Sequence, residues 1–396
     1  MSVPLAEVLR TFGPAFLREH TPSTTQARAW RAIAACRTPA LGGQLQQCDR
    51  CGRQQPLFNA CRNRHCPQCQ MRSQDAWRQA RLRELLDVPY CHLVFTLPHE
   101  INALAGVHAH PRWLYATLMG SVAQTLNEFA ANPRWLGGQP AFTLVLHTWT
   151  QDLRVHLHVH ALMACGALAA DGRWQAPARS DRFLFAVHAL SKVFKGKFLA
   201  ALQAAQENAE LARDPADPGQ RAERLRKLRR HDWVVYAKTP LAGPAQVLEY
   251  LARYTHRVAV SNERIVGIDE HAVRLRVRDN ARAGKKTVRI EGGEFIARFL
   301  RHVLPPGFKR IRHYGLLAPA GKTARLAQAR QALAMPPPNA QACEDAQAFM
   351  RRVAAMEIGA CPHCVQGRWF TVQRLVPQRQ TRPHAAACRG PPQRVH

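Results

Sequence analysis

Acidic side chains are scarce in this chain of 396 residues, which holds 27 Asp and Glu against 56 Lys and Arg. The formal net charge at pH 7 is therefore +29. A charge excess of this size bears on partners rather than on fold, and the commonest partner of such a surface is nucleic acid. Because the basic residues are spread along the whole chain, we expect a long nucleic-acid track rather than one anchoring patch. The alternative is a protein that is merely basic, as ribosomal proteins are.

Long apolar runs are missing as well. The N-terminal stretch MSVPLAEVLRTFGPAFLREH is interrupted by Arg10, Arg18 and Glu19, so it predicts neither a secretory signal nor a membrane-spanning helix. We therefore expect a cytoplasmic protein. In that compartment the 12 cysteines of the chain favour metal binding over disulfides.

Two C-x2-C pairs lie close together in the segment CDRCGRQQPLFNACRNRHCPQC. Each pair supplies two thiolates from one tight turn, and two pairs so close are typical of one tetrahedral zinc ion rather than of a redox site. The predicted ligands are Cys48, Cys51, Cys66 and Cys69. Cys61 and His65 lie between the pairs and are alternative ligands. Four protein ligands leave no open position for chemistry, so we expect a structural zinc site in an N-terminal, helical and DNA-binding region over residues 1–85.

A further C-x2-C pair, Cys361 and Cys364, lies near the end of the sequence. His384 and Cys388 are the candidates to complete a zinc site there, although their spacing argues against one. The surrounding residues 319–396 are basic and rich in proline, and this composition predicts a partly disordered tail.

The middle of the chain, residues 86–318, predicts a domain of mixed strands and helices. The principal predicted strands cover residues 90–99, 141–149, 154–163 and 232–238. The principal predicted helices cover residues 111–131, 183–213, 244–258 and 295–304. The second of these helices opens a helical insertion near residues 186–231, and residues 258–290 predict a β-meander. Antiparallel strands with flanking helices indicate an α+β fold.

The stretch RVHLHVHALM, residues 154–163, alternates histidines with apolar residues. Successive side chains of a strand point to opposite faces, so His156, His158 and His160 would share one face. His147 on the preceding strand joins them if the hairpin loop has an even number of residues, which the sequence leaves open. Solvated histidines at a sheet edge are the alternative, but three on one face favour a metal ion that polarises a bound phosphate.

Two tyrosines, Tyr250 and Tyr254, lie four residues apart in EYLARYTHR, so a helix would present both on one face. Tyrosines at this spacing often only pack a helix against a sheet. A phenol that attacks a metal-bound phosphate would have to face the same way, and because its pKa is about 10 it needs activation first. These two side chains are therefore the candidate nucleophiles.

Five motifs follow one another along the chain: CRNRHCPQCQ, FTLPHE, HVH (residues 158–160), YLARYTHR and VLPPGFKRIRHYG. With them the chain resembles the HUH-nuclease transposases of rolling-circle insertion sequences, in the two-tyrosine group with an N-terminal zinc-binding region. The resemblance extends from about Cys36 to Ala318. Leu157 stands where a proline is usual, and Ala252 replaces a glycine between the tyrosines.

The resemblance implies an HUH endonuclease core built on a five-stranded antiparallel sheet with flanking helices. The implied ligands of a catalytic Mg²⁺ or Mn²⁺ are His158 and His160, with His156, His147 and Gln151 as candidates for a third position. The implied nucleophiles are Tyr250 and Tyr254. The basic residues expected to contact DNA are Arg62, Arg64, Arg253, Arg257, Lys309, Arg310 and Arg312.

The implied reaction is a transesterification of single-stranded DNA at the ends of an insertion sequence and at its target, by a bacterial, nucleoid-associated protein. A tyrosine attacks a phosphate, forms a 5′-phosphotyrosine bond and leaves a free 3′-OH. Because the covalent bond conserves the phosphodiester linkage, rejoining needs no nucleotide cofactor.

Two other classes stay open at this point. A replication initiator or relaxase uses the same chemistry, but such proteins often carry a helicase domain, and the sequence contains no G-x-x-x-x-G-K-[ST] loop. A non-catalytic zinc protein that binds DNA would not need intact histidine and tyrosine motifs. Nicking of single-stranded DNA separates these classes.

Overall fold

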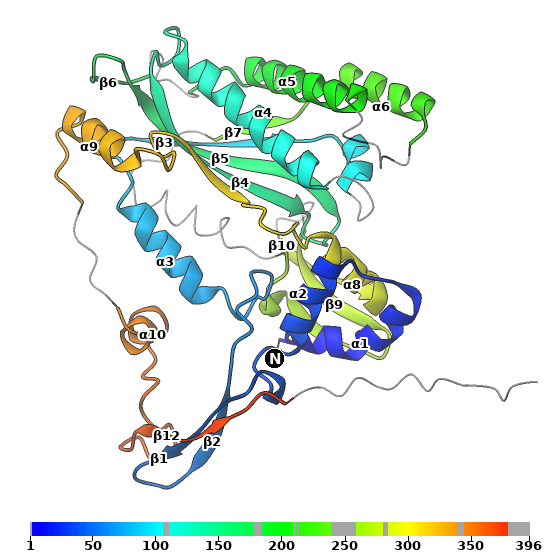
Figure 1. The fold of residues 1–396 in the computed structure, drawn as a ribbon, viewed down its shortest axis with the longest axis vertical. Coiled ribbons are helices and arrows are strands. Elements are labelled where there is room, and N and C mark those ends of the chain that lie inside the picture. Colours follow the sequence, from blue (N-terminus) through cyan, green and yellow to red (C-terminus); the bar gives the residue numbers. More distant parts are fainter. Residues whose placement is uncertain are drawn as a thin grey trace, which may run out of the picture. The chain divides into compact units, whose positions relative to one another are not determined.

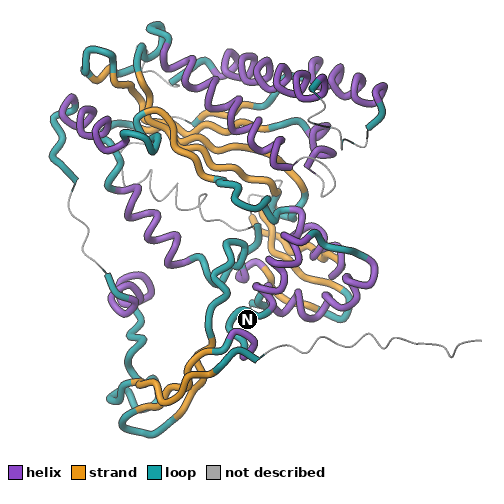
Figure 2. Tube along the Cα trace, in the orientation of Figure 1, coloured by secondary structure: helices purple, strands orange, loops and turns teal. Residues whose placement is uncertain are grey.

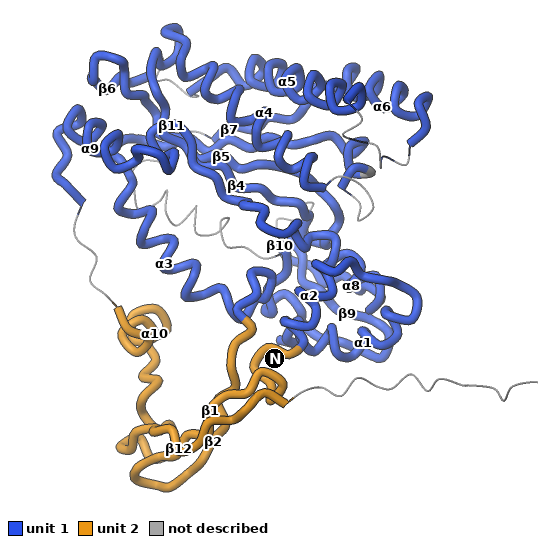
Figure 3. Tube along the Cα trace, in the orientation of Figure 1, with its two compact units in different colours: residues 1–34, 62–343 blue, residues 35–61, 344–396 orange. Residues whose placement is uncertain are grey.

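The computed structural model describes residues 2–105, 111–177, 184–208, 211, 214, 216–238, 259–279, 284–338 and 344–378. The chain divides into two compact units (Figure 3). The first unit contains residues 1–34 and 62–343, and the second contains residues 35–61 and 344–396. This division differs from the expected boundaries near residues 85 and 318, because the second unit is assembled from two segments that are far apart in the sequence.

The first unit is built on an antiparallel sheet. Its strands are β3 (Tyr90–Thr96), β4 (Gln139–Trp149), β5 (Val155–Leu168), β6 (Trp174–Gln175), β7 (Val235–Ala237) and β11 (Ile311–Gly315). The strand order is β11-β4-β5-β3-β7, and β6 pairs with β5 outside this path (Figure 1). The β4–β5 pair is the hairpin predicted from the sequence, and the α+β fold class is confirmed.

Helices cover one face of this sheet. They are α4 (Pro111–Ala131), α5 (Val187–Glu207) and α6 (Pro218–Arg230), and α4 has the bounds predicted for it. Phe194 and Phe198 of α5 belong to the same buried core as Phe95 of β3, and the ring centroids of Phe95 and Phe194 lie 5.2 Å apart. Burial of each phenyl ring contributes about 2 kcal/mol. The segment expected to be a helical insertion near residues 186–231 therefore supplies part of the core itself.

The opposite face of the sheet is covered at one end by α9 (Lys322–Ala332). Leu326 and Ala329 of α9 are buried together with Ala141 of β4 and Leu162 of β5. The helix α3 (Met71–Leu82) precedes β3, and Trp77 of α3 packs against the same cluster. The histidines of β5 lie nearer the start of that strand than this cluster does.

A second group of elements in the first unit consists of the predicted β-meander and three helices beside it. It consists of α1 (Leu5–Glu19), α2 (Thr24–Ala34), β8 (Ile265–Ile268), β9 (Ala272–Asp279), β10 (Gly284–Glu291) and α8 (Gly292–Arg301). The carboxylate of Glu291 caps α8 by accepting hydrogen bonds from the amides of Gly293 (2.8 Å) and Glu294 (2.7 Å). A Cβ at Gly292 would clash with the ring of Phe12 in α1, so a larger residue would push the two helices apart. Figure 2 shows these helices beside the three-stranded sheet.

The second unit contains a sheet in the order β12-β1-β2. Its strands are β1 (Gly43–Cys48), β2 (Gln54–Phe58) and β12 (Trp369–Leu375), and helix α10 (Ala346–Ala354) precedes β12. The register of β12 on β1 runs from Gly43 opposite Leu375 to Cys48 opposite Trp369. The expected tail over residues 319–396 is therefore ordered at α9, α10 and β12. Residues from 379 onward, which include His384 and Cys388, lie outside the described part of the chain. None of the helices among the described residues combines the length and apolar character that a membrane crossing requires.

A buried histidine, His302, joins the two groups of elements in the first unit. Its Nε2 lies 2.9 Å from the carbonyl oxygen of Leu153, and its Nδ1 lies 3.0 Å from the hydroxyl of Thr148. A carbonyl only accepts, so Nε2 carries the proton and Nδ1 accepts from Thr148. Burial lowers the pKa of His302 from 6.5 to about 4, because a charged ring would lose its hydration.

We expect the free energy of unfolding to fall as the pH drops from 6.5 toward 4. In this range His302 is protonated in the unfolded chain but stays neutral in the folded protein, so protons favour the unfolded state. At pH 5 the loss through this one group is about 2 kcal/mol relative to pH 7. Urea denaturation of the native protein and of His302→Gln at both pH values measures the difference. An equal loss of stability in both proteins would show that His302 is not a source of the pH dependence.

Candidate metal centre

The histidines of β5 lie on the face of the sheet that is turned away from α4 and α5. Leu157 and Val159, which alternate with them, are fully buried in the core under these helices. The ring centroids of His156 and His158 lie 4.9 Å apart, and those of His158 and His160 lie 5.0 Å apart. The prediction that these three imidazoles share one face is confirmed.

His147 of β4 joins this row of rings. It stands directly opposite His158 in the β4–β5 register. The ring centroid of His147 lies 5.3 Å from that of His158 and 4.6 Å from that of His160. One ring nitrogen from each of these three residues lies within 4.8 Å of the others, so the three form the histidine group.

The other two candidates for a third ligand, His156 and Gln151, lie outside this group. The ring of His156 lies 5.7 Å from that of His99, and no described atom hydrogen-bonds its buried Nδ1. The side-chain oxygen of Gln151 accepts a hydrogen bond of 3.0 Å from the backbone amide of Arg278. Of the three candidates, the structure therefore brings only His147 into the histidine group.

Hydrogen bonds orient the rings of the histidine group. The Nδ1 of His158 lies 3.1 Å from the carbonyl oxygen of His156 and so carries the proton, which leaves a lone pair on Nε2. The Nδ1 of His160 lies 2.9 Å from Nε2 of His92 on the neighbouring strand β3. Partners of this kind fix the tautomer and the ring plane of metal-binding histidines.

Two of these rings, those of His158 and His92, are neutral at pH 7. Burial lowers the pKa of His158 to about 4, with a smaller contribution from the charge of His156. Burial also lowers the pKa of His92 to about 3. Neutral imidazole is the form that binds a metal, and three such nitrogens suit a transition-metal ion such as Mn²⁺ better than Mg²⁺, which prefers oxygen ligands. The donor set therefore fits a divalent metal with open coordination positions.

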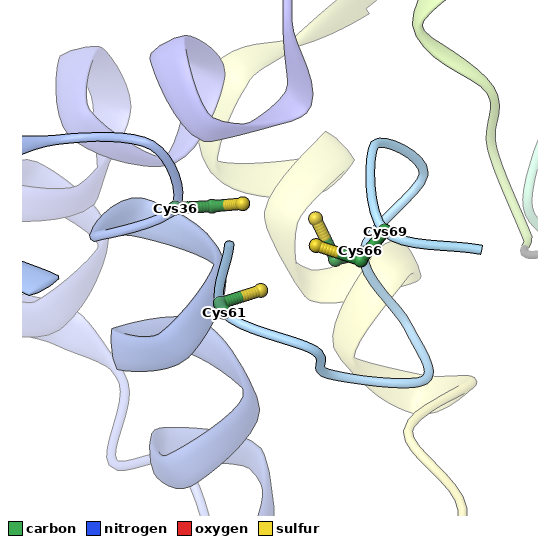
Figure 4. Close-up of side chains that lie close together, drawn as sticks. All are labelled: Cys36, Cys61, Cys66 and Cys69. Atoms are coloured by element: carbon green, nitrogen blue, oxygen red, sulfur yellow. The ribbon is translucent and has the colours of Figure 1, made fainter. Parts of the chain in front are cut away.

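Eight of the cysteines among the described residues form two groups and not the single expected site. Within the first group, Cys36, Cys61, Cys66 and Cys69 turn their sulfur atoms toward one another, all within 4.8 Å (Figure 4). The second group joins Cys48 and Cys51 to the distant pair Cys361 and Cys364, also within 4.8 Å. The four ligands predicted for one zinc ion are thus divided between two groups, because β12 pairs with β1 and brings a pair from the other end of the sequence to Cys48. Cys61, an alternative ligand, lies in the first group, and His65 lies in neither.

Several of the basic residues expected to contact DNA lie around residues 305–312. Arg64 donates to the carbonyl oxygens of Phe308 (2.7 Å) and Pro305 (3.3 Å). The guanidinium of Arg312 lies 5.1 Å from the ring centroid of Phe308. Burial, followed by the positive charge of Arg64, lowers the pKa of Arg310 to about 10.

Arg62 and Lys309 are exposed. The remaining predicted residues are Tyr250, Arg253, Tyr254 and Arg257, and all four lie outside the described part of the chain. Sequence reasoning missed two contributions to the sites. Cys36 was not a candidate ligand because no second cysteine lies near it in a C-x2-C pair, and His92 was overlooked because it is one polar residue in an otherwise apolar strand.

Comparison with known families places these features in context. Residues 141–325 match the Y2_Tnp family, described as "Putative transposase". Residues 8–97, which include both C-x2-C pairs of the N-terminal region, match the family described as "Transposase zinc-binding domain".

Two relatives are similar along most of their length. The chain is 40% identical over 379 residues to "Putative transposase y4qJ" of Sinorhizobium fredii. The aligned residues cover 93% of this chain and 94% of the relative. It is 26% identical over 294 residues to "Transposase for insertion sequence element IS801" of Pseudomonas savastanoi pv. phaseolicola, covering 72% of this chain and 68% of that one. Among solved structures, the metal-bound conjugative relaxase TrwC in complex with oriT DNA aligns with 68% of this chain and 98% of its own at 11% identity and a TM-score of 0.26.

The histidine group predicts which alanine substitutions weaken metal binding. We expect His147→Ala and His158→Ala each to lower the affinity for Mn²⁺ by at least about tenfold, since each removes a ligand nitrogen. His156→Ala is the matched control, because it removes an imidazole from the same row but from outside the group, and it should leave the affinity unchanged. Isothermal titration with Mn²⁺ measures all three. A loss in His156→Ala equal to that in His147→Ala would contradict the grouping.

Proposed function

This chain belongs to the transposase family that its residues 141–325 match, and on that premise we propose that it cuts and rejoins single-stranded DNA at the ends of an insertion sequence. The observation that supports this most directly is the group of His147, His158 and His160 on the face of the sheet that is turned away from α4 and α5. Its donor chemistry suits a divalent metal that keeps open positions for a phosphate. The strongly basic chain supplies the attraction for DNA.

The protein's own groups prepare this site. His158 and His160 each have one ring nitrogen held by a hydrogen bond, to the carbonyl of His156 and to His92, so the other nitrogen can serve as a ligand without reorganising. A bound Mn²⁺ or Mg²⁺ supplies Lewis acidity toward the scissile phosphate. The apolar core behind the strand, with Leu157 and Val159, holds the three rings in register.

The proposed nucleophile is the hydroxyl of Tyr250 or Tyr254. In the step that we propose, the phenolic oxygen forms a bond to phosphorus while the bond from phosphorus to the 3′ oxygen breaks. The phenolic proton passes to a base or water, and the departing 3′ oxygen takes up a proton to become a free 3′-OH. The product is a 5′-phosphotyrosine, and attack by a 3′-OH reverses the step without a nucleotide cofactor.

Two tyrosines suit the passage of one strand from donor to target. Residues four apart on a helix lie about one turn from each other, so both hydroxyls could reach one metal site after a small shift. One tyrosine would hold the first cut end while the other attacks the second end or the target. The partners are accordingly single-stranded DNA at the ends of the insertion sequence and at the target site, and such a protein acts at the bacterial nucleoid.

The first test removes a metal ligand. His158→Ala should abolish nicking of end-labelled single-stranded DNA and leave DNA affinity nearly unchanged, because most of that affinity comes from Lys and Arg contacts with phosphates. EDTA should stop cleavage by the native protein, and Mn²⁺ should restore it. Gel-shift and cleavage assays on the same DNA separate the two effects. Full cleavage by a protein with both His158→Ala and His160→Ala would exclude a catalytic metal at the histidine group.

The second test concerns the tyrosines. Tyr250→Phe and Tyr254→Phe should each retain some nicking but lose most transposition, and the double variant should form no covalent adduct with DNA. Phenylalanine keeps the aromatic ring, so a loss is due to the missing hydroxyl and not to lost packing. Denaturing gels with labelled DNA reveal the adduct as a shifted band. If the double variant still gives that band, neither tyrosine is the nucleophile and another group attacks the phosphate.

A further inference from the structure

The second unit contains two C-x2-C turns from opposite ends of the chain. Cys48 is the last residue of strand β1 and Cys51 follows it, whereas Cys361 and Cys364 precede strand β12. The two strands pair with each other from Gly43 to Cys48. The family of transposase zinc-binding domains matches residues 8–97 and therefore covers only the first pair.

The distances between the sulfur atoms have the size that one zinc ion requires. Four thiolates at about 2.3 Å from a tetrahedral zinc lie about 3.8 Å from one another. The Sγ atoms of Cys48 and Cys364 lie 3.6 Å apart, and those of Cys51 and Cys361 lie 3.8 Å apart. Both of these contacts join one turn to the other, so the two pairs face a single site.

The two turns have the same backbone geometry. In the first, the amide of Gly52 donates to the carbonyl of Cys48 at 3.1 Å, and in the second the amide of Val365 donates to the carbonyl of Cys361 at 2.9 Å. The residue after the second cysteine is left-handed in both turns, with φ of 69° at Gly52 and 62° at Val365. A valine rarely adopts this conformation, which costs about 1 kcal/mol or more. Its presence here indicates that the turn is held by something stronger, as a metal ion would hold it.

Contacts around the sulfur atoms fix the two turns against each other. The amide of Gly367 donates to Sγ of Cys364 at 3.3 Å, and a side chain at this position would clash with Sγ of Cys48. Asp49 bonds to Arg368 twice, through its backbone amide (3.1 Å) and through its carboxylate (2.8 Å). Amide donors of this kind stabilise thiolates, and thiolates are the ligands that zinc takes.

From these contacts we propose that Cys48, Cys51, Cys361 and Cys364 bind one structural Zn²⁺ and that β1, β2 and β12 form a zinc ribbon whose two halves are separated by most of the chain. The C-terminal segment is then a part of the zinc-binding region rather than a tail. Removal of this segment would deprive the N-terminal hairpin of two zinc ligands and of a strand. The inference does not depend on the proposed nuclease chemistry.

Zinc content distinguishes this pairing from a single site at Cys48, Cys51, Cys66 and Cys69. Cys48→Ser with Cys51→Ser should lose one equivalent of zinc relative to the native full-length protein, and Cys361→Ser with Cys364→Ser should lose one equivalent as well. The protein with all four of these changes should still lose only one, because both pairs hold the same ion. Full zinc content after the change of Cys361 and Cys364, or a loss of two equivalents in the fourfold variant, would overturn the proposal.

If a serine variant misfolds, the exchange of one ligand for another tests whether Cys364 binds the metal. Cys364→His keeps four ligands, so the protein should retain its metal, and after substitution with Co²⁺ the sulfur-to-cobalt charge-transfer absorption of the two cysteine groups should fall by about one eighth, as one of eight thiolates is lost. An unchanged absorption would mean that Cys364 is not a ligand.

The matched control is His363→Ala, which changes a residue inside the same turn. Its Nδ1 lies 3.1 Å from Nη1 of Arg53 and not in the cysteine group. This variant should keep both the native zinc content and the native cobalt absorption. Loss of one equivalent here would show that His363 is a ligand and that the site does not have four cysteines.

Discussion

The histidine group depends on a shift of one residue in the register between β4 and β5. Near the turn Trp149 stands opposite Val155, but farther along His147 stands opposite His158, so Thr148 alone faces two residues of β5. Without this irregularity His147 would stand opposite Leu157, on the face that packs under α4 and α5. An imidazole buried there without partners would cost about 1 to 3 kcal/mol, and the group would lose its third nitrogen.

Local patterns were enough to predict the features that depend only on the period of a strand or a helix. The alternation in residues 154–163 placed three histidines on one face, and the apolar pattern over residues 111–131 predicted α4 to the residue. Such patterns do not contain the register between strands. The odd number of residues between Trp149 and Val155 would by itself have excluded His147, and only the bulge reverses that outcome. A local pattern also does not predict that β3 pairs with β5, and it is this pairing that brings His92 to His160.

The cysteines show the same limit more plainly. A C-x2-C spacing predicts that two thiolates will lie in one turn, but it does not say which other turn they meet. Proximity in sequence favoured Cys66 and Cys69 as partners of Cys48, whereas the structure brings Cys361 and Cys364 there through the pairing of β12 with β1. The choice is made by the hydrogen-bonded register of the strands, whose contacts span more than 300 residues. The composition of this segment is typical of a disordered tail and does not predict strand β12, because none of the residues of β12 is buried.

In the first unit, the basic segment 305–312 is hydrogen-bonded to strand β4 beside the histidine group. The carbonyl of Arg310 accepts a hydrogen bond from the amide of Leu146, one residue before His147, at 2.9 Å. Burial and the nearby charge of Arg64 both lower the pKa of the Arg310 guanidinium, and both effects oppose a second cation there. A phosphate is the group that such a pair favours, because its negative charge would offset the repulsion between the guanidinium groups of Arg64 and Arg310. A DNA backbone that follows the basic residues 305–312 would thus be led toward the strand that carries His147, which is where the proposed reaction needs its phosphate.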